Sequence, residues 1–351
     1  MNAPDRPPKR LTEYSHGGGC GCKIAPAVLR DILAGTGGGL VPRELLVGIE
    51  TSDDAAVYAL NERQAIVATT DFFMPIVDDP GDFGRIAATN ALSDVYAMGA
   101  TPLFALALVA MPVDALPLAT IRAIVAGGEA ACRAAGIPIA GGHTIDSVEP
   151  IYGLVAIGVV DPRHLKRNAG AKAGDVVVLG KPLGVGVYSA ALKKQALDDA
   201  GYAALRATTT RLNTPGIALG RETRVHALTD VTGFGLVGHL LEVCRASGVG
   251  ATVTFEGVPL LPATRDFVGQ GFVTGASARN FAGYGDAVDF AADPTGLQRA
   301  ILTDPQTSGG LLVACAPDSV ADVLARFRDE GFADAAVIGE FNQGPPRIAV
   351  I

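Results

Sequence analysis

A glycine-rich run close to the N-terminus carries two cysteines and one lysine. It reads His16-Gly17-Gly18-Gly19-Cys20-Gly21-Cys22-Lys23. Ordering glycine costs more backbone entropy than ordering any other residue, so this composition favours a functional interpretation over a place in the core. A thiolate is a soft nucleophile, and a neighbouring lysine would lower the pKa of the thiol. We therefore expect Cys20 to lie on a flexible arm that brings it to a nucleotide held elsewhere in the chain.

Aspartates form the second chemical signature. They stand beside Thr, Ser, Asp or Val at the edges of apolar segments, at Asp54, Asp71, Asp94 and Asp230. A single aspartate in such a place is usually a helix cap or a turn former. As a set they predict a magnesium and polyphosphate site, because magnesium is bound through a few carboxylates while phosphates supply the remaining ligands. Since Gly180-Lys181-Pro182 is not a Walker A loop, ATP would bind without a P-loop.

Two further glycine motifs leave alternatives open. Residues Gly233–Gly238 match G-x-G-x-x-G, and Glu256 follows at a distance suitable for a dinucleotide site. The preceding Asp230 would repel a pyrophosphate, so an NAD-dependent oxidoreductase is the weaker interpretation. His143 follows a short strand in Gly141-Gly142-His143-Thr144, where backbone N–H groups could face a phosphate, although a structural histidine fits equally well.

Composition narrows the class of protein. The 351 residues carry a formal charge of -8, so nothing attracts the whole chain to nucleic acid or to an anionic membrane. The N-terminus lacks the apolar core of a signal peptide, and no apolar run is long enough to span a bilayer. Cys132, Cys244 and Cys315 stand in apolar contexts, as inert buried thiols do. No second cysteine pair completes a metal site with Cys20 and Cys22, and a reducing cytoplasm is expected.

Hydrophobic periodicity predicts the helices and strands that must position these residues. Helices are expected over residues 26–34, 82–98, 118–135, 202–220, 236–246 and 320–329. Strands are expected over residues 55–60, 65–73, 103–111, 138–140 and 151–160, and within 174–184. Asp82 is the expected N-cap of the second helix. Adjacent strands in the first half favour mixed sheets, and the polar stretch 161–173 is the expected domain boundary.

Taken together, the motifs resemble those of one family. The run Leu11–Lys23 is similar to the N-terminal signature of the selenophosphate synthetases. Further similar motifs follow in order along nearly the whole chain, at residues 53–58, 70–75, 88–94, 141–143, 229–235 and 304–310. The aspartate motifs alone would fit the wider superfamily of aminoimidazole ribonucleotide synthetase and thiamine-phosphate kinase, whereas the cysteine and lysine arm is specific to selenophosphate synthetases. Ala276 is a departure, because the family pattern has glycine there.

This resemblance implies both a reaction and a fold. ATP, selenide and water would give selenophosphate, AMP and orthophosphate, and the product would supply selenium for selenocysteine and selenouridine synthesis. The implied fold is mixed α+β and α/β, of the aminoimidazole ribonucleotide synthetase-like type. Its N-terminal domain would form a shared β-barrel in a homodimer, followed by a C-terminal α/β domain. The expected parts are a flexible arm with a lead-in helix at 1–48, an ATP-binding and dimerisation domain at 49–162, and the C-terminal domain at 163–351.

The resemblance also implies roles for single residues, position by position. Cys20 would be the catalytic cysteine, with Lys23 as the essential lysine beside it. Magnesium would be held by Asp54, Asp94 and Asp230. Nucleotide contacts would come from Lys23, Thr51, Ser52, Asp53, Asp71 and Asp94, and across the dimer from Gly142, His143 and Thr144.

Cofactors and partners follow from the same resemblance. Mg²⁺ is the implied cofactor and ATP a substrate, with a monovalent cation such as K⁺ as a further candidate. The implied partners are a second copy of the chain, a selenium-delivering protein similar to cysteine desulfurases, and a selenocysteine synthase that uses the product. Alternatives are another ATP-dependent kinase or synthetase of the superfamily, and a non-catalytic selenium or sulfur carrier. The carrier would use Cys20 and Cys22 but would leave the aspartates unexplained.

Overall fold

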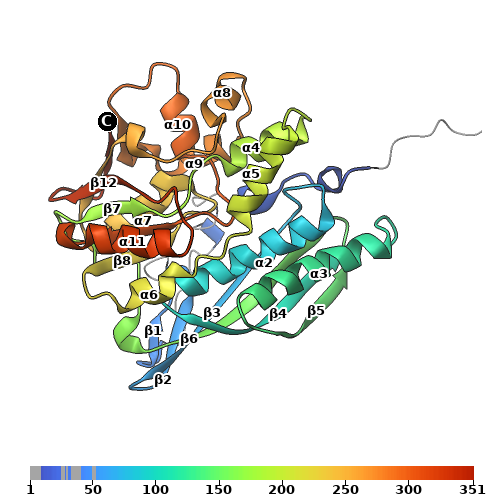
Figure 1. Ribbon diagram of the computed structural model, residues 1–351, viewed down its shortest axis with the longest axis horizontal. Helices are drawn as coiled ribbons and strands as arrows, with labels where there is room; N and C mark the ends of the chain where they lie inside the picture. The colour runs from blue at the N-terminus through green and yellow to red at the C-terminus, as the bar shows by residue number, and fades with distance from the viewer. Residues whose placement is uncertain (1–8, 25–27, 29–30, 33–40, 50–52) are drawn as a thin grey trace, which may run out of the picture.

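Two mixed sheets with their helices make up the fold, seen in the computed structural model of Figure 1. The structure describes residues 9–24, 28, 31–32, 41–49 and 53–351. Most of the helix expected at 26–34 lies outside these residues, as do Thr51 and Ser52. Within the described part of the chain, no helix is both long and apolar enough to cross a membrane.

The first sheet has the strand order β1-β2-β3-β6-β4-β5. Its strands are β1 (Leu45–Val47), β2 (Ala56–Asn61), β3 (Gln64–Phe73), β4 (Thr101–Met111), β5 (Ile139–Asp146) and β6 (Ile151–Val160). Only the β4 and β5 pair is parallel; the other described pairs are antiparallel, with β2 and β3 forming the expected hairpin. Helices α2 (Pro80–Ala97) and α3 (Leu118–Ala134) cover one face of this sheet (Figure 1).

The second sheet has the order β10-β13-β9-β12-β7-β11-β8. Its strands are β7 (Val176–Leu179), β8 (Val225–Asp230), β9 (Gly250–Val253), β10 (Val288–Phe290), β11 (Leu311–Cys315), β12 (Ala336–Asn342) and β13 (Ile348–Val350). Parallel and antiparallel pairs both occur here, so the expectation of mixed sheets is confirmed.

The second half of the chain also contains helices. The α-helices are α4 (Val185–Lys193), α5 (Asp199–Thr209), α6 (Pro215–Arg221), α7 (Gly235–Ser247), α8 (Thr264–Gly269), α9 (Gly275–Tyr284), α10 (Leu297–Leu302) and α11 (Val320–Asp329). Short 3-10 turns are η1 (Leu11–Tyr14), η2 (Gly19–Cys22), η3 (Pro162–His164), η4 (Phe255–Gly257), η5 (Gly285–Ala287) and η6 (Pro317–Ser319).

Three expectations about these elements are wrong. Asp79, not Asp82, caps α2: its carboxylate accepts a hydrogen bond from the backbone N–H of Asp82 at 2.8 Å. The helix expected over 202–220 is divided into α5 and α6, because Pro215 cannot continue a helix and instead starts the next one. The glycine loop expected after residue 140 is part of strand β5.

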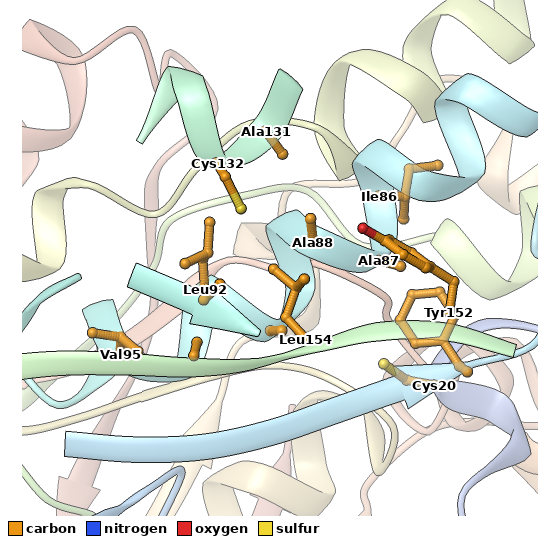
Figure 2. Close-up of a cluster of buried hydrophobic side chains, with 14 of the residues drawn as sticks. Cys20, Ile86, Ala87, Ala88, Leu92, Val95, Ala131, Cys132, Tyr152 and Leu154 are labelled. Carbon is orange, nitrogen blue, oxygen red and sulfur yellow. The ribbon is translucent and has the colours of Figure 1, made fainter. Parts of the chain in front are cut away.

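Helix α2 joins the two halves of the molecule. Nearly every residue from Phe83 to Ala97 is buried, although α2 contains polar side chains. Ile86, Leu92 and other α2 residues pack in one apolar cluster with Tyr152 of β6 (Figure 2). Tyr188 of α4 belongs to the same cluster. Because α2 is covered by the first sheet on one side and by the second half on the other, its polar residues lie at an internal boundary between them.

Candidate active site

The cysteine arm is docked on the rest of the chain. Turn η2 places Cys20 in the interior, where only 1% of the residue is exposed. The backbone N–H of Gly19 donates to Met74 O at 2.9 Å, and that of Cys20 donates to Thr307 Oγ1 at 3.0 Å. The expectation that a C-x-C between glycines stays out of the core is therefore wrong for Cys20, which belongs to the cluster in Figure 2. Glycines let the backbone approach its neighbours closely enough to bury this thiol.

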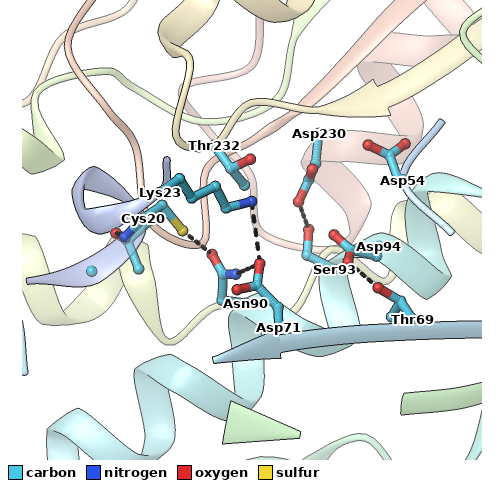
Figure 3. A network of polar contacts seen from close by, with 12 residues as sticks. Cys20, Lys23, Asp54, Thr69, Asp71, Asn90, Ser93, Asp94, Asp230 and Thr232 are labelled. Carbon is cyan, nitrogen blue, oxygen red and sulfur yellow. Dashed lines mark hydrogen bonds and ion pairs between the residues drawn. The ribbon is translucent and has the colours of Figure 1, made fainter. Parts of the chain in front are cut away.

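Asn90 connects the thiol to the charged residues beside it. The Cys20 thiol donates to Asn90 Oδ1 at 3.2 Å, and Asn90 Nδ2 donates to Asp71 Oδ2 at 2.7 Å. Lys23 Nζ lies 3.5 Å from the same Asp71 oxygen. Figure 3 shows these four side chains as one connected group. Sequence reasoning did not assign Asn90 a role, although its position one helical turn before Asp94 was a usable signal.

Burial dominates the ionisation of the thiol. The pKa of Cys20 is raised well above its usual range, first by desolvation and then by the Asp71 carboxylate. Lys23 acts in the opposite direction but more weakly, so the expectation that it lowers the pKa of the thiol overall is wrong. The pKa of Lys23 itself is raised, chiefly by Asp71, so its ammonium stays charged.

Three carboxylates lie on the other side of the site, as Figure 3 shows. Each accepts a hydrogen bond from a hydroxyl group. Thr69 Oγ1 donates to Asp94 Oδ2 at 2.6 Å, Thr229 Oγ1 donates to Asp54 Oδ1 at 2.7 Å, and Ser93 Oγ donates to Asp230 Oδ2. Strand β8 supplies Thr229 and Asp230, whereas α2 supplies Ser93 and Asp94.

The Asp94 and Asp230 carboxylates are buried, and Asp54 lies beside them partly buried. Desolvation is the main cause that raises the pKa of Asp54, Asp94 and Asp230, and the negative charge of Asp230 adds to it at the other two. Asp54 Oδ2 is buried without a hydrogen-bond partner. Among the described residues, no three His, Cys, Asp or Glu side chains are arranged to hold a metal ion by themselves. The donor set nevertheless fits magnesium in kind, because it consists of hard carboxylate oxygens with one of them left open.

The remaining expected nucleotide residues are not all at this place. Asp53 Oδ1 accepts a hydrogen bond from the backbone N–H of Asn168 at 2.6 Å, at the boundary between the two halves. Gly142, His143 and Thr144 are exposed on β5, the edge strand of the first sheet. The structure thus brings Cys20, Lys23, Asp71 and the three carboxylates together, but leaves the β5 residues apart from them.

The G-x-G-x-x-G motif has a packing explanation. A side chain at Gly233 would lie 2.8 Å from Cys20 O and 2.9 Å from Lys23 Cδ, so this glycine allows the arm to dock. Gly235 has a φ of +73° and approaches the backbone of Thr303. Glu256 is paired with Arg265 at 2.9 Å on the surface. These contacts account for the motif without a dinucleotide.

The other cysteines behave as expected. Cys132, Cys244 and Cys315 are buried and unpaired in apolar clusters, and burial raises the pKa of each thiol. Figure 2 shows Cys132 packed among alanine and leucine side chains between α2 and α3.

Comparison with known proteins identifies the family. Residues 52–160 match the model of the AIR synthase related protein N-terminal domain, and residues 172–350 match that of the C-terminal domain. Among solved structures, thiamine-monophosphate kinase from Stenotrophomonas maltophilia K279a shares the fold with a TM-score of 0.63 at 23% identity, over 94% of this chain and 96% of that one. AaThiL complexed with AMPPCP and TMP gives a TM-score of 0.61 at 19% identity, over 92% and 91%.

Sequence relatives are much closer. The selenide, water dikinase of Dechloromonas aromatica (strain RCB) is 67% identical over 342 residues, which is 97% of this chain and 98% of the relative. That of Paraburkholderia xenovorans (strain LB400) is 61% identical over 350 residues, or 100% and 99% of the two chains. With two AIR synthase related domains and such identity over nearly its full length, the chain belongs to the selenide, water dikinase family.

Proposed function

We propose that this protein makes selenophosphate from ATP, selenide and water, releasing AMP and orthophosphate for each turnover. The observation that carries the proposal is the meeting of Cys20 and Lys23 with Asp71 and the buried carboxylates, in a chain of this family (Figure 3). Selenophosphate would then serve as the selenium donor for selenocysteine and selenouridine synthesis.

The first step would take place on the thiol side. Selenide, held beside the Cys20 thiol, attacks the γ-phosphorus of ATP, and the bond from that phosphorus to the β-phosphate oxygen breaks, with ADP as the leaving group. Lys23 is charged and half-exposed beside Asp71, so its ammonium can face the oxygens of the phosphoryl group in transfer. ADP stays bound, and one positioned water then cleaves it to AMP and orthophosphate.

Asp54, Asp94 and Asp230 are the residues that would hold magnesium. When bound, the ion would neutralise the triphosphate and stabilise the charge of the transferring phosphoryl group. The protein's own contribution is to keep three carboxylates in place through Thr69, Ser93 and Thr229, hydroxyl donors that cannot neutralise them. A dependence on K⁺ stays a prediction from the resemblance.

Nucleotide contacts complete the proposal. Asp53, Asp71 and Asp94, with Thr51 and Ser52 before them, would line the nucleotide on its own subunit.

The partner copy would supply Gly142, His143 and Thr144 from β5, whose exposure leaves them available for a second chain. The face of the first sheet opposite α2 and α3 supports a homodimer, because Tyr58, Phe72, Leu103 and Ile145 are large exposed apolar side chains on its strands.

Closure of the arm is the part of the proposal that controls water. The docked arm buries Cys20, which would exclude bulk water from phosphoryl transfer to selenium and protect an oxygen-sensitive intermediate. The division into 1–48, 49–162 and 163–351, a cytoplasmic location, and the proteins that deliver selenium or take the product remain part of this proposal.

Phosphorus NMR tests the proposed reaction directly. The purified protein is kept anaerobic with ATP, magnesium and selenide, beside a sample without selenide. A selenophosphate resonance that grows together with AMP and orthophosphate is expected only in the complete sample. ADP formed without dependence on selenide would instead point to a kinase of the same superfamily with another acceptor, and intact ATP would contradict the proposal altogether.

A further inference from the structure

The turn from Asp304 to Gly310, in the second half of the chain, reaches the cysteine arm. Thr307 is buried in this turn and its Oγ1 accepts the hydrogen bond from Cys20 N–H at 3.0 Å. Gly19, with a φ of +55°, is required at this contact, because a Cβ there would lie 2.4 Å from Thr307 Oγ1. The arm can therefore approach the Thr307 hydroxyl this closely only because residue 19 is a glycine.

Asn90 can serve only the protonated form of the thiol. Its Oδ1 accepts both from Cys20 Sγ at 3.2 Å and from Ser308 N–H at 2.7 Å, while its Nδ2 donates to Asp71 Oδ2 at 2.7 Å. Rotating the amide by half a turn would place two donors or two acceptors face to face at these contacts. When Cys20 loses its proton, the sulfur consequently faces a carbonyl oxygen that cannot donate to it.

A thiolate at this position needs a donor, and two groups are close enough to provide one. Lys23 attracts the charged sulfur electrostatically, but its ammonium is already engaged with Asp71. The Thr307 hydroxyl uses an oxygen lone pair for Cys20 N–H, so its proton remains to be donated. Among the hydrogen bonds between described residues, none takes that proton, and the Thr307 hydroxyl lies close enough to lower the pKa of the Cys20 thiol.

We propose that Thr307 is a positioning residue for the reactive sulfur, accepting from the backbone N–H of Cys20 and donating its hydroxyl proton to the Cys20 thiolate. The proposal rests on the proposed role of Cys20 in selenophosphate synthesis. It assigns to the turn 304–310 the task of stabilising the charged nucleophile, which Asn90 cannot do.

The charged and titratable groups around the sulfur set the background for this effect. Asp71 from β3 and Cys22 from η2 disfavour the thiolate, whereas Lys23 favours it. The backbone of Gly233, before α7, and the amide of Asn90, on α2, are neutral. Two groups thus lower the pKa of the Cys20 thiol, Lys23 by its charge and, to a smaller extent, Thr307 by its hydroxyl.

Competitive alkylation of the arm provides the test. The full-length protein is treated with iodoacetamide at several pH values, without ATP or selenide. The rates at Cys20 and Cys22 are read separately by fragmentation mass spectrometry. Cys22 is an internal reference, because its thiol bonds to Gly19 O at 2.8 Å and not to Thr307. Opening of the arm raises the rate at the buried Cys20 more than at the partly exposed Cys22, whereas loss of the thiolate donor lowers the rate at Cys20 alone, so the two effects change the ratio in opposite directions.

Thr307→Val removes the hydroxyl with little change of volume, and we expect the ratio of Cys20 to Cys22 rates to fall about ten-fold, as for a shift of one pKa unit. Thr307→Ser should restore the ratio. Thr209→Val is the matched control, since Thr209 is a buried threonine whose hydroxyl bonds to Leu205 O in α5, and it should change nothing.

A ratio that stays constant in Thr307→Val, or that is not restored in Thr307→Ser, would overturn the proposal. If Thr307→Val does not fold, Thr307→Ala is measured in its place with the same expectation. The assay needs neither substrate, so it is independent of the proposed function: a wild-type protein that makes no selenophosphate refutes the function, while the alkylation ratio still decides the role of Thr307.

Discussion

The two sides of the site differ in how their charges are balanced. On the thiol side, the ammonium of Lys23 pairs with the carboxylate of Asp71, and Asn90 connects that pair to Cys20. On the carboxylate side, the described residues give hydrogen bonds to Asp54, Asp94 and Asp230 from hydroxyl groups, and the charge of Lys23 lowers the pKa of Asp94 and Asp230 without a direct contact. The charges on the thiol side are balanced by each other, whereas the carboxylate side has an excess of negative charge.

This difference in charge balance indicates which kind of ligand each side binds. Burying like charges without a counter-ion is costly, so a protein that does so gains only when a cation binds. A paired ammonium and a buried thiol, in contrast, are stable by themselves and are set to react once a substrate arrives. We therefore expect changes on the thiol side to affect chemistry, and changes on the carboxylate side to affect stability and metal binding as well.

Cys20→Ser is expected to have the largest effect on the reaction. Serine keeps the size of the side chain but is a far weaker nucleophile, so selenide-dependent AMP formation should fall by at least about 1,000-fold. Magnesium and ATP binding, measured by calorimetry, should stay within about two-fold of wild type. Full activity in this variant would remove Cys20 from the mechanism.

Asp230→Asn tests the excess of negative charge on the carboxylate side. Removing one of three neighbouring like charges should stabilise the metal-free protein by about 1 kcal/mol, seen as a higher urea midpoint, because Ser93 can still donate to the amide oxygen. The same change should lower activity by about 100-fold or more through lost metal binding. A variant that is destabilised without magnesium would show that the carboxylates are already compensated in the resting protein.

Thr229→Val should have a smaller effect of the same kind. It deletes the hydroxyl that holds Asp54 Oδ1, and the loss of such a supporting contact typically weakens metal affinity about ten-fold. Manganese binding followed by electron paramagnetic resonance measures this directly. Thr210→Val, whose hydroxyl bonds only to Arg206 O within the chain described, serves as control.

Lys181→Met should leave catalysis nearly unchanged and alter the pH dependence of stability. Lys181 Nζ donates hydrogen bonds to Ser308 O, next to Thr307, and to Arg211 O. Burial lowers the pKa of Lys181 to about 7. An unfolded lysine titrates near a pKa of about 10.4, so between these values the unfolded chain binds more protons. Wild-type stability should therefore rise with pH there, by roughly 1 kcal/mol per unit, relative to the Met variant.

Urea unfolding at about pH 7.5 and about pH 9.5 gives the slope of the unfolding free energy against pH for wild type and for Lys181→Met. Parallel slopes in the two proteins would mean that the hydrogen bonds to the two carbonyls keep Lys181 charged throughout.

The sequence predicted well what depends on local pattern. Strand β6 and helix α11 have the expected bounds, and the hairpin of β2 and β3 is confirmed. The N-cap of α2 was placed wrongly, because Asp79 and Asp82 are equally suited by type and only the backbone conformation distinguishes them. The prediction of one helix over 202–220 was wrong at Pro215. Proline disfavours the interior of a helix, but the prediction rested on the spacing of apolar residues alone.

The same distinction between local pattern and long-range packing applies to the residues of the site. Residue types and their spacing alone pointed to Cys20, Lys23 and the aspartates, since thiols, ammonium groups and carboxylates have few other uses in such contexts. Only the tertiary structure decided that Cys20 is buried, that desolvation outweighs Lys23, and that Asn90 and Thr307 contact the sulfur. Cys20 and Thr307 are separated by 287 positions in the chain, and burial and hydrogen-bond partners over such a separation arise only when the two halves pack together.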